Sequence, residues 1–161
     1  MIHRHPLIRL IVGAGLVATL SLTGCALTVP TDPQGTLHHV ETSGHLRAGA
    51  TPIGDALVVD DDHVSGPLVD LIEGFADEHG ARVEWTVGSE ETLVDALESG
   101  ELDLAVGAMT DATPWSDRVS VTRGYPGLAG SGDARLVALL PLGENALQSA
   151  LETYLDEESE R

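Results

Sequence analysis

Cys25 supplies the only thiol of this 161-residue chain. Arg4 and Arg9 precede it, and the run from Leu10 to Leu22 carries no charge. A positively charged start, a short apolar stretch and small residues before a cleavage site are typical of a secretory signal peptide. The apolar stretch is too short to span a bilayer as a stable helix. We therefore predict that the chain is exported and that residues 1–24 are removed.

The residues Leu22-Thr23-Gly24-Cys25 resemble the lipobox of bacterial lipoproteins. This resemblance implies that the Cys25 thiol is acylated, with chains such as palmitate, and becomes the first mature residue. It also implies a location on the extracytoplasmic face of the cell membrane, held there by lipid. The alternative is a chance match, against which the charged start and the apolar run both argue. Acylation would leave no thiol for a disulfide, a redox centre or a thiolate metal site.

Other reactive side chains predict little chemistry. Four metal-binding side chains lie close together in the sequence: His38, His39, Glu41 and His45. A flexible segment offers them no preformed geometry, and the acidic run 60–62 is better explained as a solvated turn than as a calcium loop. Ser131 has no nearby base in a recognisable nucleophile motif, and the one glycine-rich loop lacks the phosphate-binding pattern. We expect no metal and no cofactor, and the chain is not predicted to be an enzyme.

The chain is strongly acidic. Its formal net charge is −18, from 8 basic and 26 acidic residues. Such a surface repels phosphate backbones and anionic lipid headgroups, so we exclude nucleic acid as a partner. A polybasic contact with the membrane is excluded for the same reason, and attachment would rest on the acyl chains alone.

Alternating strand and helix patterns predict the elements that position the candidate residues. Strands are expected at residues 46–50, 56–59, 82–87, 102–107 and 135–140, the last of them in the middle of a sheet. Helical spacing marks residues 68–79 after Pro67, a short helix capped by Ser89, and a last helix around residues 147–155. Strands that alternate with helices predict a single α/β domain of three layers with a mostly parallel sheet.

Residues 26–43 show no periodicity and contain Pro30, Pro33 and Gly35. We interpret residues 25–43 as a lipid-anchored tether outside the core, and residues 44–161 as the domain.

The order of motifs along residues 44–157 resembles the extracellular solute-binding proteins of family 3, the polar amino-acid class that serves ABC importers. The resemblance rests on Gly44-His45-Leu46-Arg47-Ala48-Gly49-Ala50-Thr51, on the helix start at residues 64–71 and on Thr122-Arg123-Gly124-Tyr125. Residues 96–104, Ala-Leu-Glu-Ser-Gly-Glu-Leu-Asp-Leu, are similar to the family's "aLxsGxxDl" signature. The resemblance implies the fold of lobe one of a type II periplasmic binding protein.

The chain departs from this family in one large feature. Family members have two lobes, and the chain crosses to the second lobe at the segment that matches Tyr125. Here only residues 126–133 lie between that crossing and the return. The sequence therefore resembles lobe one alone, with lobe two replaced by a glycine-rich loop and the two crossover segments side by side.

Ligands of α/β sheets lie beyond the carboxyl ends of the strands. The candidate ligand-binding residues are Asp55, Met109, Thr110, Thr113, Trp115, Arg118 and Arg123. The family's ligand-carboxylate arginine matches the position of Trp115, so Arg118 or Arg123 would have to replace it through paired hydrogen bonds. The alternatives are that both arginines are solvated surface residues and that Trp115 only caps the core.

Three hypotheses for function remain. The first is a lipid-anchored, extracytoplasmic solute-binding protein associated with an ABC transporter for amino acids or similar small polar solutes. The second is a non-catalytic envelope interaction or sensory module that has lost ligand capture. The third, a decayed gene fragment, is disfavoured because the helix caps and the periodicity are intact.

Overall fold

The structure, a computed structural model, describes residues 32–61 and 63–160. The predicted signal peptide and Cys25 lie outside the described residues. Among the described residues, no helix is long and apolar enough to cross a membrane.

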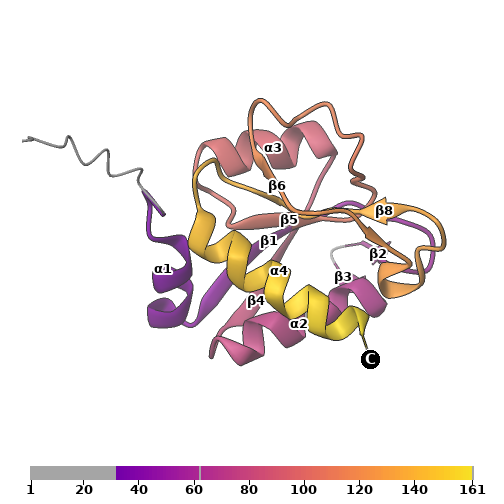
Figure 1. Cartoon of the computed structure of the whole chain (residues 1–161), viewed down its shortest axis with the longest axis horizontal. Coiled ribbons are helices and arrows are strands. Elements are labelled where there is room, and N and C mark those ends of the chain that lie inside the picture. Colours follow the sequence, from indigo (N-terminus) through magenta and orange to yellow (C-terminus); the bar gives the residue numbers. More distant parts are fainter. Residues whose placement is uncertain (1–31, 62, 161) are drawn as a thin grey trace, which may run out of the picture.

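A five-stranded sheet in the order β4-β1-β5-β9-β6 forms the centre of the fold (Figure 1). β1 (His45–Ala50) pairs in parallel with β4 (Arg82–Val87) and β5 (Leu104–Val106). β9 (Leu139–Leu140) runs antiparallel both to β5 and to the edge strand β6 (Ser120–Val121). Since only β9 is reversed, the prediction of a mostly parallel sheet is confirmed.

Helices cover both faces of this sheet (Figure 1). α3 (Glu90–Glu98) lies on one face, and α1 (Thr36–Ser43), α2 (Pro67–Glu78) and α4 (Asn145–Ser159) lie on the other. Because strand side chains alternate between the faces, the core is divided. Leu104 and Leu140 pack with the three-helix layer, whereas Ala105 and Leu139 pack with α3. The predicted three layers are confirmed.

The predicted helices after Pro67 and Ser89 are confirmed. Pro67 stands in the first turn of α2, where its missing N–H costs nothing, and Phe75 of the same helix is fully buried. The Ser89 hydroxyl oxygen accepts a hydrogen bond from the backbone N–H of Thr92 (3.3 Å) and caps α3.

The second predicted strand does not join the central sheet. β2 (Val58–Asp60) pairs antiparallel with β3 (His63–Ser65) and forms a separate hairpin. Asp61 has a φ of 53°, and Asp60 and Asp61 are both exposed, which confirms the solvated turn for the described part of the acidic run; Asp62 lies outside the described residues.

The predicted tether is wrong for residues 36–43, which form α1. Val40 is fully buried in the part of the core that the three-helix layer covers, and Leu37 packs against the same cluster. Two apolar residues three positions apart are too few for a periodic signal in the sequence. The helix is stabilised by packing and by a distant carboxylate, Glu144, whose oxygens accept the backbone N–H groups of Gln34 and Thr36.

The predicted strand over residues 135–140 is divided into two short strands with different partners. β8 (Arg135–Leu136) pairs with β7 (Tyr125–Pro126) in a small hairpin, and β9 enters the main sheet. Between them, the Val137 amide donates to the Met109 carbonyl (3.0 Å). The prediction that these residues lie in the middle of the sheet is confirmed for β9 only.

Asp103, the acid of the "aLxsGxxDl" signature, is 1% exposed and holds β1 to the turn that precedes β5. Its carboxylate accepts the Arg47 backbone amide (2.8 Å) and a two-pronged contact from the Arg47 guanidinium (2.5 and 3.2 Å). The same guanidinium donates to the Gly100 carbonyl (2.6 Å). The hydrogen bond and charge of Asp103 raise the pKa of Arg47 despite its partial burial. This signature residue therefore has a structural role, at the end of the sheet opposite the expected ligand edge.

Candidate functional site

The carboxyl ends of the three parallel strands β1, β4 and β5 meet at one edge of the sheet, here called the ligand edge. Thr51, which follows β1, joins the three ends. Its backbone N–H donates to the carbonyl of Val106 in β5 (3.0 Å), and its hydroxyl donates to the carbonyl of Gly88, which follows β4 (2.7 Å). Pro52 and Ala108 beside this junction are exposed. The three strand ends are thus joined by hydrogen bonds at the ligand edge, and residues beside them are open to solvent.

Gly107, which follows β5, makes this close approach possible. Its φ is 135°, and a Cβ on it would lie 1.9 Å from the Thr51 carbonyl oxygen. Only glycine combines that backbone angle with that approach. The sequence places both residues at this edge, within the candidate ranges 51–55 and 107–110, but it does not reveal the contacts that they make with each other.

Five of the predicted site residues lie in the segment between β5 and β6: Met109, Thr110, Thr113, Trp115 and Arg118. The Thr113 amide donates to the Thr110 carbonyl (2.9 Å), and the Trp115 amide faces the Thr113 hydroxyl (3.4 Å). The half-buried Trp115 ring packs on the α3 side of the core, and its Nε1 donates to Glu90 (3.3 Å). Met109 is 1% exposed in the same cluster, so its side chain belongs to the core.

Arg118 is held by α3. Its guanidinium pairs with Asp95 (2.7 Å) and with Glu98, and it stacks over the Trp115 ring at 5.5 Å from the centroid. The hydrogen bonds that the guanidinium donates to Glu98 and Asp95 raise the pKa of Arg118. Arg118 is therefore a structural link between the turn and the helix.

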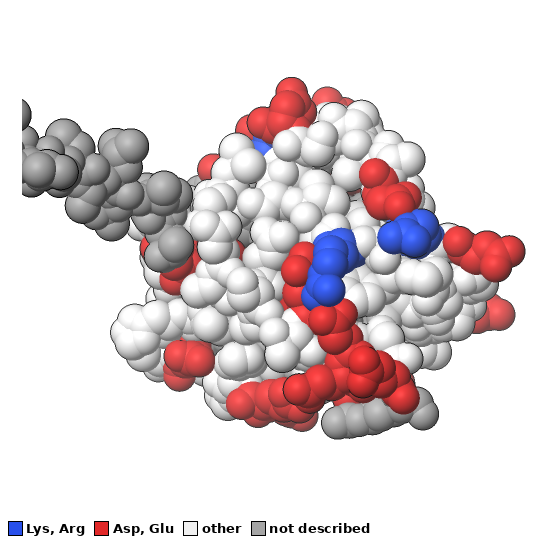
Figure 2. All heavy atoms as spheres, viewed as in Figure 1, with Lys and Arg blue, Asp and Glu red and all other residues white. Residues whose placement is uncertain are grey.

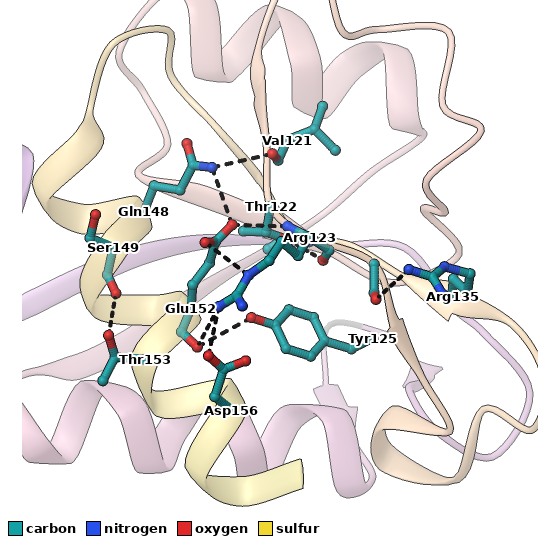
Figure 3. A network of polar contacts seen from close by, with 12 residues as sticks. Val121, Thr122, Arg123, Tyr125, Arg135, Gln148, Ser149, Glu152, Thr153 and Asp156 are labelled. Atoms are coloured by element: carbon teal, nitrogen blue, oxygen red, sulfur yellow. Dashed lines mark hydrogen bonds and ion pairs between the residues drawn. The ribbon is translucent and has the colours of Figure 1, made fainter.

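Arg123 is held by α4 (Figure 3). Its backbone N–H and its Nε donate to the Glu152 carboxylate (2.9 and 3.2 Å), and its Nη2 donates to Asp156 (2.7 Å). The adjacent Tyr125 hydroxyl donates to the Glu152 carbonyl (3.2 Å). Burial raises the pKa of Tyr125 to about 12, with a smaller opposing effect of Arg123. This network fixes the crossover segment to the last helix.

The two arginines therefore cannot hold one ligand carboxylate together. Arg118 is paired with the helix on one face of the sheet, and Arg123 with a helix on the other face. Each guanidinium already binds two carboxylates of its own lobe. The Arg123 side chain is 57% exposed, so it is a surface arginine as in the alternative interpretation, and the Arg118 side chain is 30% exposed; both are paired with carboxylates of the lobe.

Asp55 lies apart from the other predicted residues. Its loop is closed by an isolated bridge between Ile53 and Leu57 and covers the start of α2, where the Leu68 amide donates to the Ala56 carbonyl (2.9 Å). The exposed Asp55 side chain borders a shallow groove together with Pro67 and Ser131. The loop that replaces lobe two thus forms one wall of a groove beside the ligand edge.

That replacement loop is short and packed. β7 and β8 pair side by side, Tyr125 with Leu136 and Pro126 with Arg135, as predicted for the crossover segments. The single turn η1 (Leu128–Gly130) lies between them and places Leu128 against the core. Arg135 adds a contact with Asp111 (2.7 Å). The chain therefore closes on itself where a second lobe would begin.

Acidic side chains outnumber basic ones on the face shown in Figure 2. They gather along α2 and the C-terminal end of α4, and the basic side chains visible on that face lie among them (Figure 2). Within residues 32–61 and 63–160, no group of three or more His, Cys, Asp or Glu side chains could hold a metal ion.

Comparison with known proteins identifies the fold. The sequence profile of the bacterial extracellular solute-binding proteins, family 3, matches residues 50–157, well over half of the chain. The chain belongs to this family. The chain corresponds to lobe one of such a protein, because its fold matches a solved single domain 1 over 97% of that domain's length.

One such structure is the arginine-bound form of domain 1 from TmArgBP of T. maritima. It superposes with a TM-score of 0.64 at 19% identity, covering 74% of this chain and 97% of that one. An ancestral cationic amino acid solute-binding protein gives a TM-score of 0.64 at 14% identity, covering 78% of this chain and 94% of that one. At these identities the likeness concerns the fold alone.

A protein of Alkalilimnicola ehrlichii, membrane-bound lytic murein transglycosylase F 2, is 32% identical over 97 residues. The match covers 59% of this chain and 21% of that protein, so the chain spans about a fifth of this relative.

The ligand edge predicts an unequal response to two glycine substitutions. Gly107→Ala should lower the free energy of unfolding by more than about 3 kcal/mol, because the new methyl group collides with the Thr51 carbonyl. Gly54→Ala is the matched control: its φ is also positive, 47°, but a Cβ there has nothing within 4 Å, so only about 1 kcal/mol is expected. Urea unfolding measures both. Equal losses would contradict the close packing of the strand ends.

Proposed function

We propose that this chain is a lipid-anchored, extracytoplasmic solute-binding lobe that presents small polar solutes to an ABC transporter. The observation that carries the proposal is the ligand edge itself. Thr51, Gly88 and Gly107 hold three strand ends together with exposed residues beside them, in a lobe that is closed without its second half. Membership of the solute-binding family and the likeness to domain 1 of TmArgBP support it.

The charge of the chain favours a solute with a positive group. Acidic residues outnumber basic ones 26 to 8, and Arg118 and Arg123 are both engaged by carboxylates. A solute recognised by its carboxylate alone would find no free guanidinium from either residue. Amino acids with cationic side chains, such as the arginine bound by domain 1 of TmArgBP, are therefore the proposed class.

Binding to one lobe is expected to be weak. A second lobe normally completes the enclosure of a ligand, and enclosure contributes most of the buried surface. A lipid on Cys25 would offset the weakness by holding the lobe near a permease, where the local concentration is high. In this proposal the anchor and the single lobe act together.

One observation favours a second candidate, an envelope interaction or sensory module without ligand capture. The two arginines proposed to hold a ligand carboxylate both stabilise the lobe instead. In either case we propose that the chain acts by binding and not by catalysis. The match to a lytic transglycosylase covers a fifth of that enzyme and transfers no activity to this chain.

Titration with arginine separates the two candidates. We expect arginine to shift the backbone amide resonances of Thr51, Gly107 and their neighbours, with a Kd on the order of 1 mM, while glutamate and glucose do not. Arg118→Ala should lower the melting temperature and leave this Kd unchanged, because its guanidinium binds α3. If no polar solute shifts the ligand edge, the interaction module is the better account.

The anchor is tested independently of the ligand. In a bacterial host, the full-length chain should incorporate labelled palmitate and fractionate with the membrane, whereas Cys25→Ser should lose the label and be released. Thr28→Ser, a change that leaves residues 22–25 intact, is the control and should behave as the wild type. A Cys25→Ser chain that remained in the membrane fraction would refute anchoring by lipid at this residue.

A further inference from the structure

Glu144, the residue before α4, carries a fully buried carboxylate that accepts hydrogen bonds from the start of α1. Its Oε1 accepts the Gln34 amide (2.8 Å) and its Oε2 accepts the Thr36 amide (3.0 Å). Both donors belong to the start of α1, where the N-cap residue Gly35 has no side chain to offer. Glu144 therefore supplies the missing cap from 108 residues away along the chain.

Asp32 places a second carboxyl group against the first. Its side chain interacts with that of Glu144, and its Oδ1 is buried with no hydrogen-bond partner among the described residues. Its backbone amide donates to the Gly143 carbonyl (3.1 Å), which holds the residue in place. Ionised carboxylates only accept hydrogen bonds, so this pair is bonded only while one of the two carries a proton.

The environment decides which carboxyl holds the proton. Burial opposes ionisation of Glu144, but the hydrogen bonds from Asp32, Thr36 and Gln34 outweigh it and lower the pKa of Glu144. Burial, the hydrogen bond to Glu144 and its negative charge raise the pKa of Asp32 to about 6. The proton therefore resides on Asp32.

No cation among the described residues offsets the pair. The pKa of each carboxyl is affected by the other carboxyl and by a hydrogen bond with the uncharged Thr36, and that of Glu144 also by a hydrogen bond with the uncharged Gln34. The ionisable side chains of α1 occupy exposed positions: His38, His39 and Glu41. From α3, the nearby Glu98 is exposed and paired with Arg118.

We propose that Asp32 and Glu144 form a proton-operated latch: a shared proton docks residues 32–36 on the start of α4, and its loss releases them. The inference stands on the described residues alone and does not depend on the proposed function.

The sign of the pH dependence follows from the two shifts. Because the pKa of Asp32 is raised in the docked state, its contribution is fully present below its ordinary value of 3.8 and is lost as the pH rises through about 6. Because the pKa of Glu144 is lowered, its contribution is present above its ordinary value of 4.5 and is lost as the pH falls. The latch is therefore closed at about pH 5, between these limits, and open at neutral pH.

Amide hydrogen exchange in the full-length chain tests the latch. The amides of Gln34 and Thr36 donate to Glu144, so their protection, corrected for the intrinsic rate, should fall at least about tenfold between pH 5 and pH 7.5. Asp32→Asn carries a donor at every pH and should make the protection independent of pH. Asp77→Asn, at an exposed position of α2, is the control and should keep the wild-type pH dependence.

A carboxyl ¹³C titration of Asp32 is the second readout and is expected to show a midpoint near 6. A midpoint near 3.8, or protection of Gln34 and Thr36 that does not change with pH in the wild type, would overturn the proposal. So would a pH dependence that survives in Asp32→Asn.

Discussion

The position of β9 is the constraint on which the rest of the structure depends. This strand lies between β5 and β6, in the interior of the sheet, yet it follows the crossover in the sequence. Leu139 and Leu140 are fully buried and face the two opposite halves of the core. The lobe is therefore complete only if the chain that leaves through β7 returns through β8. In a two-lobed relative a whole domain intervenes at this point, and here a loop of a few residues makes the return.

Three arginines stabilise the short return of the chain and the segments next to it. Arg123 binds the crossover to α4, Arg135 binds it to Asp111, and Arg118 binds the preceding turn to α3. In an acidic protein each arginine is surrounded by possible carboxylate partners, so pairing within the lobe competes with pairing to a ligand. Because of this competition, an arginine of the lobe is not expected to bind a ligand carboxylate. The backbone groups of the ligand edge are the remaining candidates for ligand contacts.

The elements that were predictable from the sequence are those whose signal is local. The spacing of Leu68, Ile72 and Phe75 marks α2, and Ser89 marks the start of α3, because a cap and a periodic face need only neighbouring residues. The absence of the second lobe was also predictable, because the segment between the two matched crossover segments is too short to form a lobe. These predictions are confirmed by the fold and by the family to which the chain belongs.

The features that were not predictable depend on distant residues. α1 was missed because its cap, Glu144, lies 108 residues away, and the side-chain pairs of Arg118 and Arg123 span 20 to 33 residues. No spacing rule reveals such contacts. From the sequence the two arginines are therefore candidate ligand-binding residues, whereas in the fold they link structural elements. The contact between Thr51 and Gly107 was not predictable for a related reason: it depends on the close approach of two strands that are distant in the sequence.

Amide hydrogen exchange of the whole chain tests most directly the claim that the crossover closes lobe one. The Thr51 amide bonds to β5, and the Val137 and Thr122 amides bond across the crossover to Met109 and Ala138. If the lobe is one cooperative unit, all three amides exchange through the same opening, with protection equal to within about tenfold. Exchange of Val137 and Thr122 about a thousandfold faster than Thr51 would show that the crossover opens by itself, and would contradict the account of a lobe complete without its partner.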